Sequence, residues 1–377
     1  MTTRISPEWA NAHNFAAGPG ALPESVLDGL EQAVKCVPGV GLSIFGIGHR
    51  TDWFKMIVSE TKARIRTLAQ IPDDWEIVFL QGGATLQFSM APINLGATSD
   101  SRGGFIRSGY WAAKAIAESA SVCTPVVLWD GSDGGHTSLP DDDCLGSGGD
   151  LLFTQYVSNE TVDGVQFGRA LHHKRGAFSI CDVSSDFLTR RFDFAAHDIV
   201  YAHAQKNIGP AGMTIVMLSP RAVEASLKHR GSIIPMLSYA AHIEHDSVYN
   251  TPPVFEIYAA YLSTGWMLRE FGDMTAIEAF SRTKASLIYA ALDGAGELFR
   301  VPVLPEHRSI SNVVFDIPNE WLAQRFAAEA EMRGFYGVSG HRSRGGFRVS
   351  LYNGVSVPAA FDFAEFIREF AVISRSR

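Results

Sequence analysis

Tyr201-Ala-His-Ala-Gln-Lys206-Asn-Ile-Gly-Pro-Ala-Gly212 is the stretch around which the rest of the chain is organised. The apolar run from Ile199 to Ala204 predicts a buried strand, and the Gly-Pro-Ala-Gly sequence after it predicts a turn. Lys206 therefore stands at the carboxyl edge of a sheet, where open α/β folds bind their ligands. A lysine after a strand is usually a solvated turn residue, but partial desolvation here would lower the pKa of its amine. That makes Lys206 a candidate nucleophile for a Schiff base with pyridoxal phosphate.

A second apolar run, Phe178-Ser-Ile-Cys-Asp182, ends in an aspartate that precedes Lys206 by 24 residues. Pyridoxal phosphate acts as an electron sink only while its ring nitrogen stays protonated, and a buried carboxylate can hold that proton in place. Asp182 is the predicted partner of the ring nitrogen. The alternative is a helix cap or turn residue before Ser184-Ser185.

An anion site is predicted where Glu76-Ile-Val-Phe-Leu80, a strand, runs into Gln81-Gly-Gly-Ala-Thr-Leu-Gln-Phe88, the start of a helix. Free N–H groups and the positive end of a helix dipole meet at such a turn. Glycines that only allow close packing of helix and strand are the alternative. The glycine-rich stretch from Gly39 to Arg50 lacks the spacing of a dinucleotide fingerprint, and no strand clearly precedes it.

Composition places the chain among ordinary globular proteins. Its 377 residues are enough for two domains, with 46% hydrophobic and 19% charged residues and no apolar run of about eighteen residues that would predict a membrane span. The first residues lack the layout of a signal peptide, which predicts a cytoplasmic protein. The net charge of −8 argues against nucleic acid as a partner. An anionic small molecule must then be held by a local cluster of cations.

Cysteine and histidine patterns offer no metal site. The four cysteines (Cys36, Cys123, Cys144 and Cys181) include no Cys-x-x-Cys pair, so we expect free, buried thiols and neither a disulfide framework nor a zinc site. The histidine pairs His172-His173 and His242-x-x-His245 are interpreted as surface residues. We predict no metal cofactor.

The order of elements predicts an α/β fold. Further strands are expected at 126–129, 151–157, 178–181, 199–204 and 213–218, and the segments between them are too long for hairpins. This favours a mostly parallel sheet covered on both faces, with a surface loop from Asp130 to Asp150. A smaller α+β unit is predicted from helices at 275–291, 320–333 and 359–373 and strands at 310–315 and 347–352. We expect a large α/β domain over residues 15–258 and a small domain over 259–377, joined by residues 1–14.

Motifs along nearly the whole chain resemble those of the phosphoserine aminotransferases, a family of class V, fold-type I pyridoxal-phosphate transferases. They are Asn14-Phe-Ala-Ala-Gly-Pro19, Gly48-His-Arg50, Gln81 to Phe88, Asn159-Glu-Thr-Val-Asp-Gly164, Ala204 to Gly212, Asn250-Thr-Pro-Pro253, Gly340-His-Arg342 and Arg348-Val-Ser-Leu-Tyr-Asn353. Any one of these alone would be weak, whereas their order is specific.

The resemblance implies pyridoxal 5'-phosphate as the cofactor and gives each site residue a role. Lys206 would hold the aldehyde, Asp182 the ring nitrogen, and Trp111 would stack on the ring. The remaining contacts would come from Thr161 to the cofactor, from Gly83, Ala84, Thr85 and Gln205 to its phosphate, and from Asn250 and Thr251 to the cofactor phosphate of a neighbouring subunit. The expected assembly is a homodimer with shared active sites.

For the substrates, the resemblance assigns Arg348 to the α-carboxylate, through the two-pronged contact that a guanidinium offers. His49, Arg50, His341 and Arg342 would form a cationic pocket for the distal phosphate or carboxylate. A solvated basic loop is the alternative for the segment that follows Gly340. Thr85 departs from one branch of the family, which has an arginine there for the substrate phosphate, so the number of cations on that phosphate stays open.

The implied activity is ping-pong transamination of 3-phosphohydroxypyruvate with L-glutamate, which yields O-phospho-L-serine and 2-oxoglutarate for serine biosynthesis. Some family members also serve pyridoxine biosynthesis, and the sequence does not separate one activity from two. The alternatives are another class V enzyme, such as a desulfurase or lyase with Cys144 as its mobile thiol, and a non-catalytic protein that binds phosphorylated metabolites.

Overall fold

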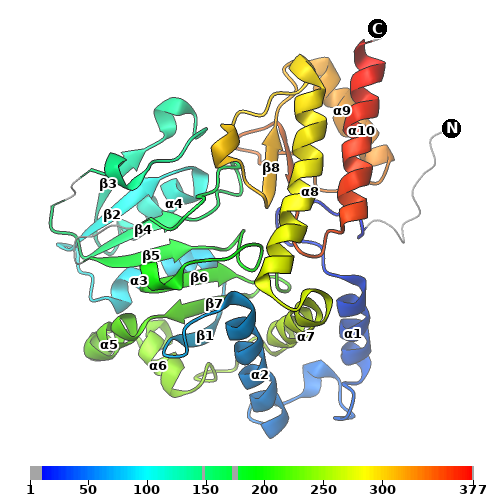
Figure 1. Cartoon of the computed structure of the whole chain (residues 1–377). Helices are drawn as coiled ribbons and strands as arrows, with labels where there is room; N and C mark the ends of the chain where they lie inside the picture. Colours follow the sequence, from blue (N-terminus) through cyan, green and yellow to red (C-terminus); the bar gives the residue numbers. More distant parts are fainter. Residues whose placement is uncertain (1–10, 147–148, 172–176, 376–377) are drawn as a thin grey trace.

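The computed structural model describes residues 11–146, 149–171 and 177–375 and contains two sheets (Figure 1). The larger has seven strands in the order β1-β7-β6-β5-β4-β2-β3. Its strands are β1 (Glu76–Gln81), β2 (Arg102–Arg107), β3 (Thr124–Asp130), β4 (Phe153–Val157), β5 (Phe178–Asp182), β6 (Ile199–His203) and β7 (Met213–Leu218). β7 pairs antiparallel with β1 and β6, and the other neighbouring pairs are parallel. The predicted α/β fold with a mostly parallel sheet is confirmed.

Helices cover both faces of this sheet because its strands are apolar on both sides. The helices are α1 (Glu24–Lys35), α2 (Asp52–Ala69), α3 (Gln87–Asn94), α4 (Tyr110–Ser119), α5 (Pro220–His229), α6 (Tyr239–Glu244) and α7 (Val254–Phe271). Alternate residues of β6 show the two faces: Val200 and Ala202 pack in the cluster with α1, α2 and α7, whereas Ile199 and Tyr201 pack in the cluster with α3 to α6.

The smaller part of the molecule is built on two antiparallel strands, β8 (Asn312–Phe315) and β9 (Phe347–Ser350). Helices α8 (Met274–Gly294), α9 (Glu320–Met332) and α10 (Val357–Arg375) lie beside them (Figure 1). Together they enclose a separate hydrophobic cluster, to which Phe15 and Ala21 also contribute. The predicted α+β unit is therefore present in the described residues.

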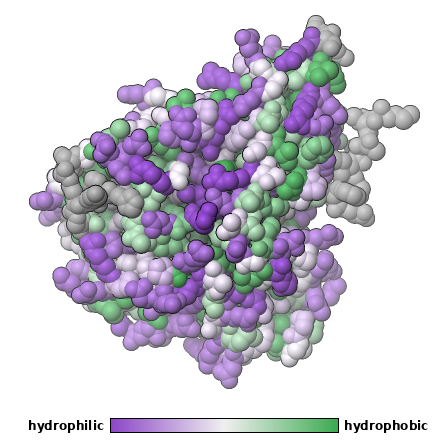
Figure 2. Space-filling view, viewed as in Figure 1, coloured by the Kyte–Doolittle hydropathy of each residue, from purple (hydrophilic) through white to green (hydrophobic). Residues whose placement is uncertain are grey.

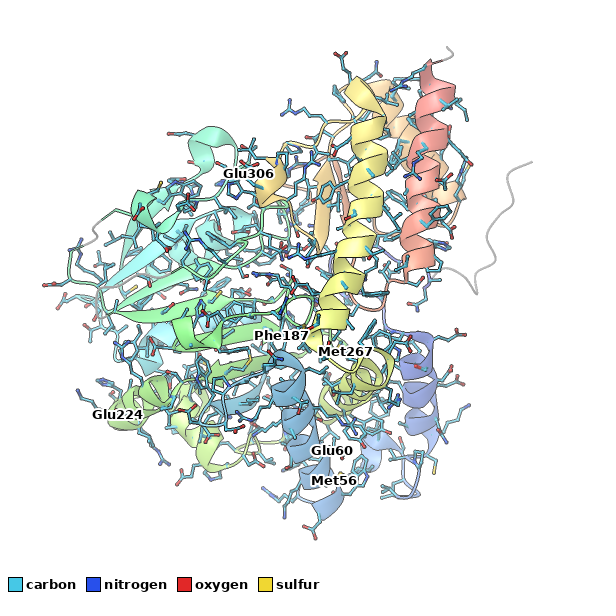
Figure 3. All side chains as sticks on the ribbon, viewed as in Figure 1. Met56, Glu60, Phe187, Glu224, Met267 and Glu306 are labelled. Atoms are coloured by element: carbon cyan, nitrogen blue, oxygen red, sulfur yellow. The ribbon has the colours of Figure 1, made fainter. Side chains whose placement is uncertain are left out.

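α8 connects the two parts, because its first turn packs with the larger core and its later turns pack with the smaller one. Met274 and Ile277 belong to the first cluster, and Ile288 and Leu292 to the second. Figure 3 shows Phe187 and Met267 close to this junction. We propose that the boundary between the two domains lies within α8 rather than at residue 258. Residues 1–10 of the N-terminal segment lie outside the described residues.

Hydrophilic side chains gather on the face seen in Figure 2, in the region where the two parts of the molecule meet. Within the described ranges, no helix combines the length and the apolar character needed to cross a membrane.

Three expectations need correction. Cys36 and Cys144 are exposed, so only two of the four free thiols are buried. His242 is buried rather than at the surface, and its ring Nε2 lies 3.0 Å from the carbonyl oxygen of Met236.

β2 was not predicted from the sequence because glycines interrupt its apolar pattern. A Cβ atom on Gly103 would lie 2.3 Å from the ring of Phe153, so the glycine makes room for the neighbouring strand. The pair His172-His173 lies outside the described residues.

Candidate active site

Two adjacent parallel strands bring the central pair of residues to one edge of the sheet. Asp182 is the last residue of β5, and Lys206 follows β6 by three residues. The two strands pair with Asp182 opposite Tyr201, so both side chains leave the sheet at its carboxyl end. A turn after Lys206 returns the chain to β7. Side chains that are separate in sequence are thus placed around one opening.

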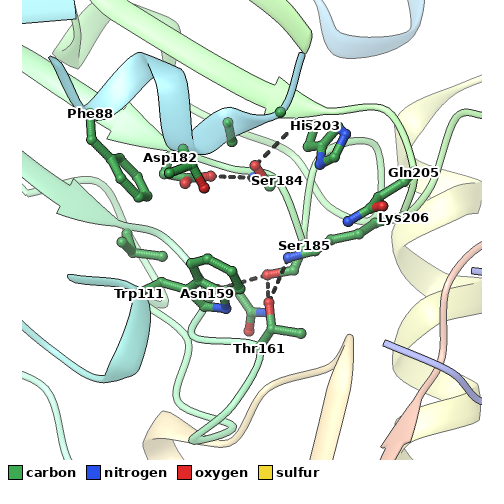
Figure 4. A pocket seen from close by; sticks show the side chains of 14 residues that line it. Phe88, Trp111, Asn159, Thr161, Asp182, Ser184, Ser185, His203, Gln205 and Lys206 are labelled. Carbon is green, nitrogen blue, oxygen red and sulfur yellow. Dashed lines mark hydrogen bonds between the residues drawn. The ribbon is translucent and has the colours of Figure 1, made fainter. Parts of the chain in front are cut away.

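That opening is a cavity of about 590 Å³, a volume that includes part of its mouth (Figure 4). It is lined by Gly83, Ala84, Thr85, Phe88, Trp111, Val157, Asn159, Thr161, Asp182, Ser184, Ser185, His203, Gln205 and Lys206. Eight of these residues were predicted as cofactor ligands from the sequence.

Lys206 is 8% exposed and extends into the cavity. Its Nζ donates a hydrogen bond of 2.7 Å to the hydroxyl of Thr161 and lies 5.8 Å from the ring centre of Trp111. Burial lowers the pKa of the Lys206 amine from 10.5 to about 8, and Asp182 opposes this shift. An amine with such a pKa is partly neutral near pH 7, as a nucleophile or base requires.

Asp182 is also buried, and one carboxylate oxygen accepts the backbone N–H of Ser184 at 2.8 Å. Burial raises the pKa of the Asp182 carboxyl, whereas Ser184 and Lys206 act in the opposite direction. The exclusion of water disfavours the charged forms of both Lys206 and Asp182. A cationic group placed beside this carboxylate would be stabilised strongly for the same reason.

The segment for which an anion site was predicted consists of a strand, a turn and a helix start. Gly82 has a φ of 92°, which favours glycine, and Gly83 precedes the short 3-10 helix η3 (Ala84–Leu86), which runs into α3. Gly83, Ala84 and Thr85 line the cavity together with Gln205, and the first N–H groups of a helix have no partner within the helix. This wall suits an anionic group.

Trp111 is held by the first turn of α4, whose N–H groups are bound by the buried Glu160 and the partly buried Asp163. Glu160 accepts the N–H groups of Trp111 and Ala112 at 2.9 and 2.8 Å, and Asp163 accepts that of Tyr110 at 2.8 Å. Burial and the nearby Asp163 raise the pKa of Glu160 to about 8. The indole Nε1 of Trp111 is buried and has no hydrogen-bond partner in the described structure.

Arg348 lies beside the cavity rather than in its lining. Its Nη1 donates to the carbonyl oxygen of Thr161 at 3.2 Å, and its buried Nε has no partner among the described residues. Burial lowers the pKa of this guanidinium. The imidazole of His341 lies 4.8 Å from the ring of Tyr110, and Arg342 is exposed next to it. Arg348 therefore has an N–H group available for the carboxylate of a ligand.

Besides Arg348, His341 and Arg342, four further predicted residues do not line the cavity of this chain: His49, Arg50, Asn250 and Thr251. His49 and Arg50 stand just before α2. The amide of Asn250 donates to the side-chain oxygen of Gln81 at 3.2 Å, and the Gln81 amide donates to the carbonyl oxygen of Thr251. The segment before His49 and the segment after Thr251 are in contact, because the rings of Phe45 and Phe255 stack with their centres 5.4 Å apart.

Sequence reasoning missed part of the lining: Phe88, Val157, Asn159, Ser184, Ser185 and His203. The amide of Asn159 donates to the hydroxyl of Ser185 and to the side chain of Asn312, both at 2.7 Å, which connects the cavity wall to β8. The position of His203 was the clearest available signal, because it is a polar residue at the end of an apolar strand.

Comparison with known proteins relates nearly the whole chain to one group. The sequence model of the aminotransferase class-V family matches residues 12–355. A phosphoserine aminotransferase of Bacillus cereus is 37% identical, over 96% of this chain and 99% of the relative. The solved phosphoserine aminotransferase of Bacillus circulans subsp. alkalophilus superposes with a TM-score of 0.90 at 34% identity, covering 96% of this chain and 99% of that one. A pyridoxal-phosphate-bound phosphoserine aminotransferase from Trichomonas vaginalis gives a TM-score of 0.86 at 29% identity, with 94% and 99% covered.

Proposed function

The chain belongs to the aminotransferase class-V family and is a pyridoxal-phosphate-dependent transaminase, and we propose that it transfers the amino group of L-glutamate to 3-phosphohydroxypyruvate. The products are O-phospho-L-serine and 2-oxoglutarate. The observation that carries this proposal is the cavity in which the amine of Lys206 and the carboxylate of Asp182 are both buried.

The residues of the cavity fit pyridoxal phosphate in charge and shape. Asp182 offers a buried carboxylate for a cationic ring nitrogen, and the turn at Gly83 offers N–H groups for a phosphate. Trp111 lies beside Lys206 and provides a flat aromatic face. Its unpartnered Nε1 leaves a donor for a polar atom of the ligand. Lys206 is the residue to which the aldehyde would be joined.

When bound, pyridoxal phosphate supplies an electron sink for the negative charge that develops at the substrate Cα. Asp182 keeps the ring nitrogen protonated by pairing with it. The Nζ of Lys206 would remove the proton from the substrate Cα and later return one. Burial lowers the pKa of this amine to about 8 in the cofactor-free protein, so its surroundings favour the neutral form that a base requires. Thr161 orients this amine through its hydroxyl.

Substrate recognition rests on Arg348. Its free Nε and its position beside Thr161 support a two-pronged contact with the α-carboxylate that both substrates share. The distal anion, a phosphate in one substrate and a carboxylate in the other, is assigned to a pocket with His341 and Arg342. One pocket can then serve both half-reactions.

We further propose a homodimer in which His49, Arg50, Asn250 and Thr251 act on the cavity of the partner subunit. These residues do not line the cavity of their own chain. Two apolar residues of the segment before His49, Leu42 and Phe45, are 54% and 69% exposed, which suits a contact with another subunit.

A desulfurase is less well supported. Cys144 is exposed in the segment between β3 and β4 and does not line the cavity. The buried Cys123 and Cys181 have raised thiol pKa values because of burial, which makes them poor nucleophiles.

The test mixes purified protein, glutamate and either 3-phosphohydroxypyruvate or 3-hydroxy-2-oxo-4-phosphonooxybutanoate, the keto acid of pyridoxine biosynthesis, and follows 2-oxoglutarate. We expect turnover with the first acid, and turnover with the second would add the pyridoxine pathway. Lys206→Ala should abolish both turnover and the visible absorbance of the bound cofactor while the protein stays folded. Transamination by that variant would overturn the role of Lys206, and no turnover by the unchanged protein would overturn the proposed reaction.

A further inference from the structure

His203 is a polar side chain of the cavity that no part of the proposed chemistry uses. It is the last residue of β6, and its imidazole lines the cavity near Gln205 (Figure 4). The ring Nε2 is buried and has no hydrogen-bond partner in the described structure. A buried polar atom without a partner is unfavourable, so a ligand that supplies one would be held more tightly.

The alternation of side chains along β6 explains where this imidazole lies. Tyr201 is two residues earlier on the same face of the strand, and its ring packs 6.4 Å from that of Phe88 in α3. The next side chain on this face, His203, therefore reaches the turn that precedes α3. Its backbone N–H is bound to the hydroxyl of Ser184 at 3.0 Å, which fixes the start of the side chain.

Gly83 brings the predicted anion site into direct contact with the imidazole. A Cβ atom on Gly83 would lie 3.3 Å from Cε1 of His203 and 3.6 and 3.8 Å from its two ring nitrogens. The ring thus packs against the backbone that would bind an anion. A side chain at position 83 would press on it, so the glycine keeps the ring and the turn close together.

Few groups that line the cavity could neutralise or bind an anion. Among the described residues that line the cavity, Lys206 is the only lysine or arginine, and its amine is committed to the aldehyde. Burial and the nearby Lys206 lower the pKa of His203 to about 4 in the protein without a ligand. The imidazole is then neutral at pH 7 and carries one N–H that can be donated.

We propose that His203 donates a hydrogen bond from its imidazole to the phosphate group of the bound cofactor and so acts as a further cofactor-binding residue. The inference rests on the proposed function, because it takes pyridoxal phosphate as the ligand. It adds a side-chain donor to the backbone N–H groups of the turn at Gly83.

The test compares two ligands that differ only in the phosphate. The cofactor-free protein is titrated with pyridoxal phosphate and with pyridoxal, and binding is followed by absorbance. The covalent contribution of Lys206 is common to both ligands and cancels in the ratio of their dissociation constants. We expect His203→Ala to weaken pyridoxal phosphate binding roughly ten- to hundredfold and to change pyridoxal binding by less than about threefold.

If His203→Ala does not fold, the same two titrations are made with His203→Gln. Its amide N–H can also donate, so we expect a loss that is specific to pyridoxal phosphate but smaller than that of the alanine variant. The matched control is His242→Gln, which changes another buried histidine whose pKa is lowered by burial but which lies on α6 outside the cavity. Neither affinity should change in that control.

The outcomes separate the two proposals. Equal weakening of both ligands by the His203 variants, or no weakening of either, would overturn the phosphate contact of His203. A failure of the unchanged protein to bind pyridoxal phosphate would instead overturn the proposed function.

Discussion

Lys206 is buried in surroundings that disfavour its own charge. Its pKa falls to about 8, so the unfolded chain binds more protons than the folded one between pH 8 and 10.5. The stability of the cofactor-free protein should therefore rise with pH across that window. Lys206→Met removes the buried charge, and we expect the cofactor-free variant to be more stable than the unchanged protein at pH 7, by on the order of 1–3 kcal/mol.

This advantage should shrink as the pH rises from 8 towards 10.5. Free energies of unfolding in urea, measured at pH 7 and pH 10 at one protein concentration, provide the check. The control is Lys55→Met, since the side chain of Lys55 is 60% exposed and should show no such difference. A Lys206 variant that is less stable at both values of pH would contradict the proposed cost of the buried charge.

At the scale of the element, α4 shows how a helix terminus sets the position of an aromatic ring. Glu160 accepts two N–H groups of its first turn and the hydroxyl of Ser108, all within the protein interior. Glu160→Val would leave these donors unpaired, and we expect it to lower the free energy of unfolding by about 2–4 kcal/mol. Glu160→Gln keeps one oxygen that can accept from two of the three donors, but its NH2 group cannot accept from the third, so we expect a smaller loss of about 1–2 kcal/mol.

Urea unfolding at pH 7 compares the two variants, and the fluorescence of the cofactor-free proteins reports on the surroundings of their tryptophans, Trp111 included. Since burial raises the pKa of Glu160 to about 8, its side chain is mostly neutral at pH 7, so Glu160→Gln changes the acceptors of the helix but hardly changes the charge of the site. Equal losses for valine and glutamine would show that the acceptor oxygens do not hold the helix.

Elements with a clear apolar run were predictable from the sequence, and so were the site residues that stand at their ends. Asp182 and Lys206 each follow a buried run, so adjacent strands in a parallel sheet were expected to bring them together. β2 was missed because glycine interrupts its apolar pattern at position 103. The reason for this glycine lies in another strand, since a Cβ atom there would collide with the ring of Phe153. Asn159 was not expected in the cavity because its partners, such as Asn312, are distant in the sequence.

At the scale of the whole molecule, the segment after β9 connects the smaller part to the lysine of the active site. The backbone N–H of Asn353 donates to the side chain of Asn207 at 3.1 Å, next to Lys206. The hydroxyl of Tyr352 donates to the carbonyl oxygen of Ala17 at 2.8 Å. Because Arg348 lies on β9, these contacts fix the distance between the proposed carboxylate site and the reactive amine.

Lys284 of α8 holds this segment from the other side. Its fully buried Nζ donates to the carbonyl oxygens of Leu351, Tyr352 and Val355 at 3.0, 2.8 and 2.9 Å. Burial lowers the pKa of the Lys284 amine, but only the ammonium form has three protons for three acceptors. We therefore infer that this lysine is charged in the folded protein.

Lys284→Met should destabilise the protein by roughly 3–5 kcal/mol, because it leaves three buried carbonyl oxygens without a donor. It should also raise the KM for glutamate, since the segment that joins Arg348 to the Lys206 region loses its support, whereas the visible absorbance of the bound cofactor should persist. Urea unfolding and steady-state kinetics measure the two effects, with the exposed Lys228→Met on α5 as the control. A Lys284 variant that is destabilised but binds glutamate as the unchanged protein does would mean that the segment keeps its place without the ammonium group, and that the contacts of Asn353 and Tyr352 alone set the distance between the two sites.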